Sequence, residues 1–173
     1  MLVVIVLTKH AIERLFERFQ DKKFDVKVVM NTLENVIKEG LILKKGKDIW
    51  IVTARYTLCC AIENDKLIVK TIMKTTKANY IRAVKYGVKH NWNIIFENVK
   101  QIERWCKQLE SMKNVCKICG ISKEQTQIER CKIYGFYICS FCCVVVGGYS
   151  EKCKGCLFYP KMKKLGNKPI YIY

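Results

Sequence analysis

Six cysteines near the end of the chain form three C-x-x-C pairs: Cys116/Cys119, Cys139/Cys142 and Cys153/Cys156. A C-x-x-C turn places two sulfurs on one side of a tight loop, where they can share a tetrahedral ion. Two such pairs separated by about 15–20 residues are a known zinc arrangement. Because 19 residues (120–138) lie between Cys119 and Cys139, the spacing predicts a metal site, with zinc as the metal.

Two further cysteines bring the candidate ligands to eight, enough for two structural zinc ions. We group them as Cys116, Cys119, Cys139 and Cys142 around one ion, and Cys131, Cys143, Cys153 and Cys156 around a second. A partition that joins the 116/119 pair to the 153/156 pair is open, as are disulfide or redox use and an iron–sulfur cluster. A four-thiolate site has no open position for water, so we expect structural ions rather than catalytic ones.

The first residues bear on the choice between thiolates and disulfides. Residues 1–7 are apolar, but they lack a basic leader and a small-residue cleavage site, and they are too short to span a membrane. We expect a buried strand there, no membrane association, and a reducing cytoplasmic location in which thiols stay free to bind metal.

The net charge of +17 indicates a polyanionic partner. A divalent ion held by four thiolates leaves a charge of −2 at each site, so two filled sites reduce the total only to about +13. We expect nucleic acid, and RNA more than DNA. An acidic protein, or a lysine-rich surface without a polyanion, is the alternative.

Hydrophobic periodicity places these groups on three successive parts of an α+β chain. Residues 1–76 predict a small β-α-α-β-β-β domain with strands at 2–7, 49–53, 56–62 and 67–73 and helices at 9–19 and 26–39. A further strand signal at 41–43 leads into the strand at 49–53. Residues 77–114 predict a helical connector with helices at 77–90 and 92–113, and residues 115–173 a zinc-binding module. The apolar seam of the longer helix would either pack on the first domain or form a homodimer.

The first helix carries a motif beyond its core positions. His10, Arg14 and Arg18 recur at intervals of four residues, within the segment Leu7-Thr8-Lys9-His10-Ala11-Ile12-Glu13-Arg14-Leu15-Phe16-Glu17-Arg18. By residue type this stripe is also typical of a solvated helix face. The segment resembles the opening of small domains in the RelE/BrnT-like toxin superfamily, in its uncharacterised branch. The resemblance covers residues 1–75 or so, including the order of strands.

The resemblance implies a metal-independent endoribonuclease restrained by an antitoxin, or a toxin-like fold retained only for binding. Its candidate catalytic residues here are His10, Arg14, Arg18 and Arg55. RNA cleavage through the 2′-hydroxyl needs a proton acceptor, an acid for the leaving oxygen and cations for the phosphorane charge, which imidazole and guanidinium groups can supply. Lys70 and Lys74 would extend a basic cleft along the strands.

The cysteine-rich part resembles a treble-clef or zinc-ribbon module, an arrangement shared by many unrelated functions. Lysines and aromatic residues alternate there, as in proteins that bind single-stranded nucleic acid. The candidate contacts are Lys132, Tyr134, Tyr137, Lys152 and Lys154. A function of another class is also open: a non-catalytic adaptor or inhibitor that docks on a protein complex through the helical connector and the zinc module.

Overall fold

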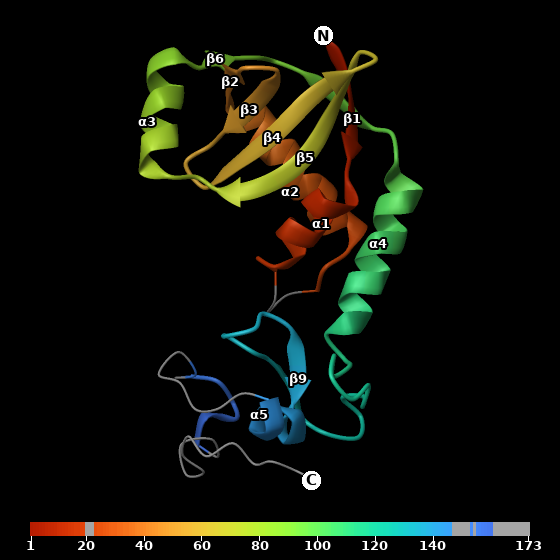
Figure 1. Ribbon diagram of the computed structural model, residues 1–173. Helices are drawn as coiled ribbons and strands as arrows, with labels where there is room; N and C mark the ends of the chain where they lie inside the picture. The colour runs from red at the N-terminus through yellow and green to blue at the C-terminus, as the bar shows by residue number, and fades with distance from the viewer. Residues whose placement is uncertain (20–22, 147–152, 154, 161–173) are drawn as a thin grey trace. The chain divides into compact units, whose positions relative to one another are not determined.

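The computed structural model describes residues 1–19, 23–146, 153 and 155–160 of the 173-residue chain (Figure 1). The chain divides into two compact units, Met1–Leu109 and Glu110–Tyr173. We call them unit 1 and unit 2 and describe each by itself. Unit 1 is a mixed α/β domain, and unit 2 contains the cysteine cluster.

Unit 1 is built on a curled sheet of seven strands with the order β6-β2-β3-β4-β5-β1-β7. The strands are β1 (Leu2–Leu7), β2 (Leu41–Lys45), β3 (Asp48–Val52), β4 (Tyr56–Glu63), β5 (Lys66–Lys74), β6 (Val88–Lys89) and β7 (Asn93–Phe96). β1 pairs in parallel with β5 and with β7, while the other neighbours are antiparallel. The predicted strands from β1 to β5 are therefore all present.

Two tight turns connect the antiparallel strands where the sequence predicts them. Asn64 and Asp65 have φ of 49° and 60° between β4 and β5. These values suit a two-residue hairpin turn whose twist matches that of the strands, and Asn and Asp tolerate them better than most residues. Gly46 has φ of 62° between β2 and β3.

The helices α1 (Lys9–Phe16) and α2 (Val26–Glu39) begin directly after the N-caps Thr8 and Asp25. The side chain of Thr8 accepts a hydrogen bond from the N–H of Ala11, and that of Asp25 accepts one from Val28. Ile12 and Leu15 of α1 and Val29 and Leu33 of α2 are fully buried in the core. The sequence expectation that α1 continues to residue 19 was wrong, because Arg18 and Phe19 bond to the carbonyls three residues earlier in a closing turn.

A third helix, α3 (Lys77–Tyr86), packs against β2 and β3. Ala83 is its one buried side chain, and it contacts Leu43 and Val52. Neighbouring residues of a strand point to opposite faces, so Ile51, which lies beside Gly40 at the end of α2, faces the other side. α2 and α3 therefore cover opposite faces of the sheet.

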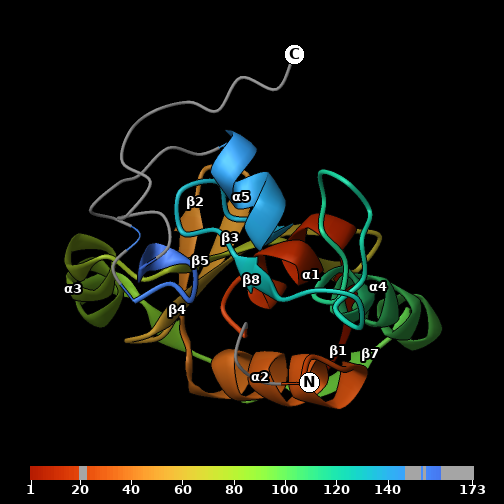
Figure 2. The same cartoon turned by 90° about the horizontal axis from the view of Figure 1, so that it is seen from below.

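The segment after α3 differs from the predicted helical connector. Residues 88–89 pair with β2 and residues 93–96 pair with β1, so this segment completes both edges of the sheet. The predicted helix at 77–90 ends at Tyr86, and the one predicted from 92 begins at Val99, as α4 (Val99–Met112). Without β7, the outer N–H and C=O groups of β1 would lack partners, which favours strand over helix here. Figures 1 and 2 show α3 and α4 at opposite edges of the sheet.

Unit 2 has little regular structure. A hairpin joins β8 (Ile128–Arg130) and β9 (Tyr137–Cys139), and α5 (Ser140–Val146) follows directly. Its buried cluster consists of Cys116, Ile128, Cys131, Ile138, Cys139 and Cys142. Four of these six are cysteines, so the unit has little hydrocarbon to stabilise it. Within the described residues, no helix is long and apolar enough to span a bilayer.

Candidate metal centre

The first pair of ligands lies on a tight loop near the start of unit 2. Gly120 donates its N–H to the carbonyl of Cys116 at 2.9 Å, and Cys116 donates to the carbonyl of Ile121 at 2.9 Å. Gly120 has φ of 75°, a conformation that residues with a Cβ rarely adopt. This backbone turns Cys116 and Cys119 to the same side, as the C-x-x-C spacing predicts.

The second pair comes from the junction of β9 and α5. Cys139 is the last residue of the strand, and Cys142 lies in the first turn of the helix. The N–H of Cys142 points at Sγ of Cys139, 3.4 Å away. The hairpin also contacts the first loop, because the N–H of Lys117 donates to the carbonyl of Tyr137 at 2.9 Å.

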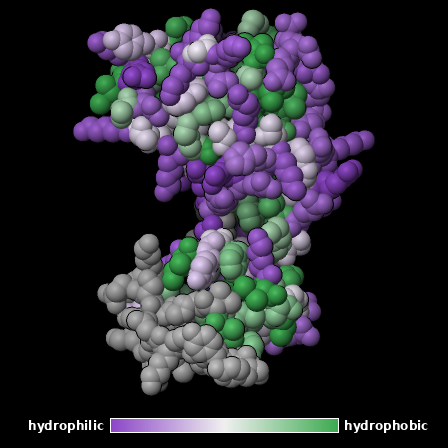
Figure 3. All heavy atoms as spheres, viewed as in Figure 1, coloured by the Kyte–Doolittle hydropathy of each residue, from purple (hydrophilic) through white to green (hydrophobic). Residues whose placement is uncertain are grey.

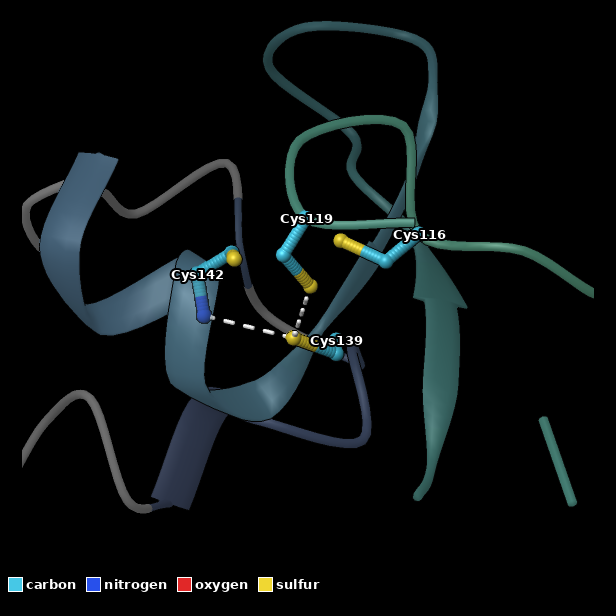
Figure 4. Close-up of side chains that lie close together, drawn as sticks. All are labelled: Cys116, Cys119, Cys139 and Cys142. Carbon is cyan, nitrogen blue, oxygen red and sulfur yellow. Dashed lines mark hydrogen bonds between the residues drawn. The ribbon is translucent and has the colours of Figure 1, made fainter. Parts of the chain in front are cut away.

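The four sulfurs converge on one point, as Figure 4 shows. All four Sγ atoms lie within 4.8 Å of one another, and those of Cys119 and Cys139 are 3.8 Å apart. Cys116, Cys139 and Cys142 are buried, whereas Cys119 is exposed. The structure thus brings together the quartet predicted from the spacing.

Hydrogen bonds to sulfur stabilise the thiolate form of Cys116, the form in which a cysteine binds metal. Burial by itself raises the pKa of the Cys116 thiol, but the N–H groups of Cys119, Cys139 and Ile118 stabilise its thiolate and bring the pKa to about 6. Burial and the neighbouring sulfurs raise the pKa of Cys139 and of Cys142. Four thiols this close without a cation cannot all ionise, because their charges repel.

A divalent metal ion resolves that conflict. Tetrahedral zinc takes four thiolates at about 2.3 Å, which places the sulfurs nearly 4 Å apart, close to the separation of Cys119 and Cys139. Hard cations such as Mg²⁺ and Ca²⁺ prefer oxygen ligands. The quartet could therefore hold a metal ion such as zinc, and the residues present fit that ion.

The other candidate ligands lie elsewhere in unit 2. Cys131 is buried at the end of the β8 strand, and Cys143 follows Cys142 on α5. Cys153 and Cys156 flank a turn in which the N–H of Cys156 donates to the carbonyl of Cys153 at 2.9 Å. Among the described residues, the first quartet is the group already close enough to hold an ion.

The predicted catalytic residues are only partly brought together. His10 and Arg14 lie one turn apart on α1, where Nδ1 of His10 is 4.0 Å from Glu13 and Nη1 of Arg14 is 3.1 Å from Glu17. Arg18 lies beyond the end of α1, and its guanidinium donates to the carbonyl of Arg14.

Arg55 lies apart from the start of α1. It occupies the turn before β4, where its carbonyl accepts from Thr75, and its guanidinium lies 5.1 Å from the ring centre of Tyr56. At the start of α1, the hydroxyl of Thr8 donates to the carbonyl of Lys70 on β5. Thr75, the partner of Arg55, directly follows the end of β5. Lys70 and Thr75 are five residues apart along extended chain, so the start of α1 and Arg55 are bound to points about 16 Å apart.

The predicted nucleic-acid contacts have mixed surroundings. Nζ of Lys70 is 2.6 Å from Asp48, which satisfies part of its charge, and Lys74 is exposed at the end of β5. Tyr134 is 47% exposed and stacks on Phe136 with ring centres 5.6 Å apart. Lys132 is exposed, and Tyr137 is half-buried on β9. Lys152 and Lys154 lie outside the described residues.

Sequence reasoning missed one basic surface. No Asp or Glu occurs between residues 66 and 96, a stretch that holds seven Lys or Arg residues. Within it, α3 exposes three cations and two tyrosines: Lys77, Tyr80, Arg82, Lys85 and Tyr86. We call these five residues the α3 surface. The lack of Asp and Glu in this stretch was a signal in the sequence that could have indicated the surface.

Comparison of the chain with protein-family models, with curated proteins and with solved structures gives no match.

Proposed function

We propose that this protein is a zinc-containing nucleic-acid-binding protein that prefers RNA, with the α3 surface as its main contact. The observation that carries this proposal is the arrangement of cations on α3 without neighbouring carboxylates. Of the total charge of +17, unit 1 holds +10, from 21 basic and 11 acidic side chains. A surface of this kind attracts phosphate chains.

The α3 cations differ from those on α1 in their surroundings. On α1, Glu13 and Glu17 offset the charges of Lys9 and Arg14. In the described part of the chain, no carboxylate lies within ion-pair distance of Lys77, Arg82 or Lys85. An unneutralised cation on an exposed helix gains more from a phosphate than one that already has a carboxylate partner.

Exposed rings accompany these cations. Tyr86 is 64% exposed, and Nζ of Lys85 lies 5.0 Å from its ring centre. Tyr80 is 40% exposed one and a half turns earlier. Unpaired bases stack on aromatic side chains while lysines contact phosphates, so the mixture favours single-stranded over double-stranded nucleic acid. In Figure 3, hydrophilic side chains cover most of unit 1, with hydrophobic ones scattered among them.

Unit 2 adds a second, smaller platform of the same kind. Tyr134 stacks on Phe136, and Nζ of Lys117 lies 5.7 Å from the ring centre of Phe136. Both elements depend on the cysteine quartet, because Lys117 belongs to its first loop and Phe136 precedes β9. Zinc would thus act by positioning these side chains, with no part in chemistry.

Direct binding to a labelled 20-nucleotide single-stranded RNA tests this function. We expect Lys77→Glu/Arg82→Glu/Lys85→Glu to weaken binding at least tenfold and to reduce the salt slope of log K by about 2, since each phosphate contact contributes about 0.7. Lys27→Glu/Lys47→Glu/Lys100→Glu is the matched control, because it changes the charge equally at exposed positions elsewhere on unit 1. Equal losses in the two variants would contradict the assignment to α3.

RNA cleavage at His10 and Arg14 is part of the same proposal and rests on the toxin-like motif of α1. In unit 1, β1 runs into α1 and α2, and the antiparallel strands β3 to β5 follow, which supports this part of the proposal. Both side chains are about half exposed, so substrate can reach them. Labelled RNA incubated with the protein in EDTA should be cut by the native chain and not by His10→Ala/Arg14→Ala. Equal cleavage by both proteins would remove these residues from the site.

A docking function is the second candidate, and apolar residues on α3 favour it. Ile81 and Val84 are 57% and 60% exposed on a helix that also exposes three basic side chains. A partner bound there would be an acidic protein with an apolar centre. Binding that fails with RNA at low salt, but persists with such a partner at high salt, would select this function instead.

A further inference from the structure

Four cysteines of unit 2 remain after the first quartet is assigned: Cys131, Cys143, Cys153 and Cys156. All four are free thiols, and Cys131 is buried while the others are half-buried. Three separate segments supply them, the loop after β8, the helix α5 and the turn at 153–156. Their surroundings repeat features of the first site.

The loop that holds Cys131 is a second copy of the loop that holds Cys116. The sequence Cys116-Lys-Ile-Cys-Gly120 recurs as Cys131-Lys-Ile-Tyr-Gly135, with Tyr134 in place of the second cysteine. Gly135 has φ of 76° and donates to the carbonyl of Cys131 at 2.8 Å, as Gly120 does to Cys116. The N–H of Tyr134 points at Sγ of Cys131 at 3.5 Å, which is the same three-residue relationship that Cys139 has with Cys142.

The turn at 153–156 lies against this loop. Gly155 has φ of 78°, and a Cβ built on it would lie 3.2 Å from Nζ of Lys132. Lys132 is the neighbour of Cys131, so the turn with its two cysteines lies beside the Cys131 loop. The positive φ explains why a glycine occupies position 155.

Cys143 completes the set from α5. Successive residues of a helix point about 100° apart, so Cys143 and its neighbour Cys142, which belongs to the first quartet, point to different sides of α5. Cys143 is half-buried and packs against the buried cluster that contains Cys131.

We propose that Cys131, Cys143, Cys153 and Cys156 bind a second metal ion, of the zinc class, with one ligand each from the loop and the helix and two from the turn. Ligands for the two sites alternate along the chain, since Cys131 precedes Cys139 and Cys143 follows Cys142. The second ion ties the 153–156 turn to the hairpin. Metal binding draws the sulfurs of these four cysteines together. The sulfurs of the first quartet already lie close to one another. This site does not depend on whether the protein binds nucleic acid.

Native mass spectrometry of the full chain, prepared with zinc, tests the second site. We expect two ions per chain in the unaltered protein and in Cys106→Ser, a control at a buried cysteine of unit 1. Cys153→Ser/Cys156→Ser should hold one ion, and so should Cys119→Ser, which removes the first site instead. One ion in the unaltered chain, lost in Cys119→Ser, would overturn the second site and leave the first standing. Two ions in Cys153→Ser/Cys156→Ser would overturn the ligand assignment.

A second measurement needs no variant and so does not depend on how a variant folds. Alkylation of the native chain, read residue by residue after digestion, should be slow at Cys131, Cys143, Cys153 and Cys156 with zinc and fast after a chelator. Cys59, half-buried in unit 1, is the matched reference and should react at the same rate in both samples. Rapid modification of the four thiols in zinc, while Cys116, Cys139 and Cys142 stay protected, would contradict the proposal.

Discussion

The side chain of Asn98 pairs with both backbone groups of Leu7. Its Oδ1 accepts from the N–H of Leu7 at 3.2 Å, and its Nδ2 donates to the carbonyl of Leu7 at 2.9 Å. β7 ends at Phe96, which pairs with Ile5. Asn98 therefore continues the ladder to the last residue of β1 with a side chain, and its own carbonyl accepts from Ile102 at the start of α4.

We expect Asn98→Ala to reduce the free energy of unfolding of unit 1 by about 1–3 kcal/mol, because it leaves both groups of Leu7 without partners. Chemical denaturation followed by circular dichroism measures this change. Asn93→Ala, at an exposed position of β7, is the control and should change the unfolding free energy by less than about 0.5 kcal/mol. Equal effects in the two variants would mean that the Leu7 contacts contribute nothing.

Replacing Gly120 should weaken metal binding, although there is space for a side chain at this position. A Cβ at this position meets no atom within 4 Å, but φ is 75°. The strain of holding alanine in that conformation is about 1–2 kcal/mol, so Gly120→Ala should weaken zinc binding about 5–30-fold in a competition titration. Asn tolerates positive φ better, and Gly120→Asn should lose less. A larger loss with Asn than with Ala would contradict this explanation.

Cys60 gives unit 1 a dependence on alkaline pH. The thiol is fully buried in β4, and burial, then the charges of Cys59 and Asp48, raises its pKa above the ordinary value of 9.0. Above pH 9 the unfolded chain releases this proton and the folded chain keeps it, so stability is complete at lower pH and falls as pH rises, by at most about 1.4 kcal/mol per unit. Denaturation at several pH values should show a shallower decline in Cys60→Ala. Parallel declines would exclude the thiol as the cause.

Metal removal should act on unit 2 and spare unit 1. The buried cluster of unit 2 is mostly cysteine, and a unit this small cannot fold on the remaining apolar area. After chelation under reducing conditions, hydrogen exchange should become fast at β8, β9 and α5 while β4 and β5 keep their protection. Protection of β9 that survives complete removal of metal would contradict a metal-dependent fold.

The local features of both units could be predicted from sequence. Thr8 and Asp25 predict the caps of α1 and α2, alternation of apolar residues predicts β3 to β5, and the spacing from Cys119 to Cys139 predicts the quartet. Each of these signals depends on residues that lie near one another in the chain. Such patterns are strongest where local preference and tertiary packing agree.

The features that sequence analysis missed depend on distant partners. Residues 93–96 continue the apolar spacing of α4 and look helical, yet they form β7 because the open edge of β1 needs hydrogen bonds. Asn98 has no local signature, since its partner is 91 residues away. The repeat of the Cys116 loop at Cys131 was visible in the sequence, but its meaning depends on matching glycine geometry in space.

X-ray absorption at the zinc edge tests the central claim, that thiolates of unit 2 bind metal. Protein purified without added chelator should contain zinc with a shell of four sulfurs at about 2.3 Å and no lighter ligands. Cys119→Ser should reduce the zinc content while Cys106→Ser leaves it unchanged. A native protein that contains no zinc, or a shell dominated by nitrogen or oxygen near 2.0 Å, would contradict the account.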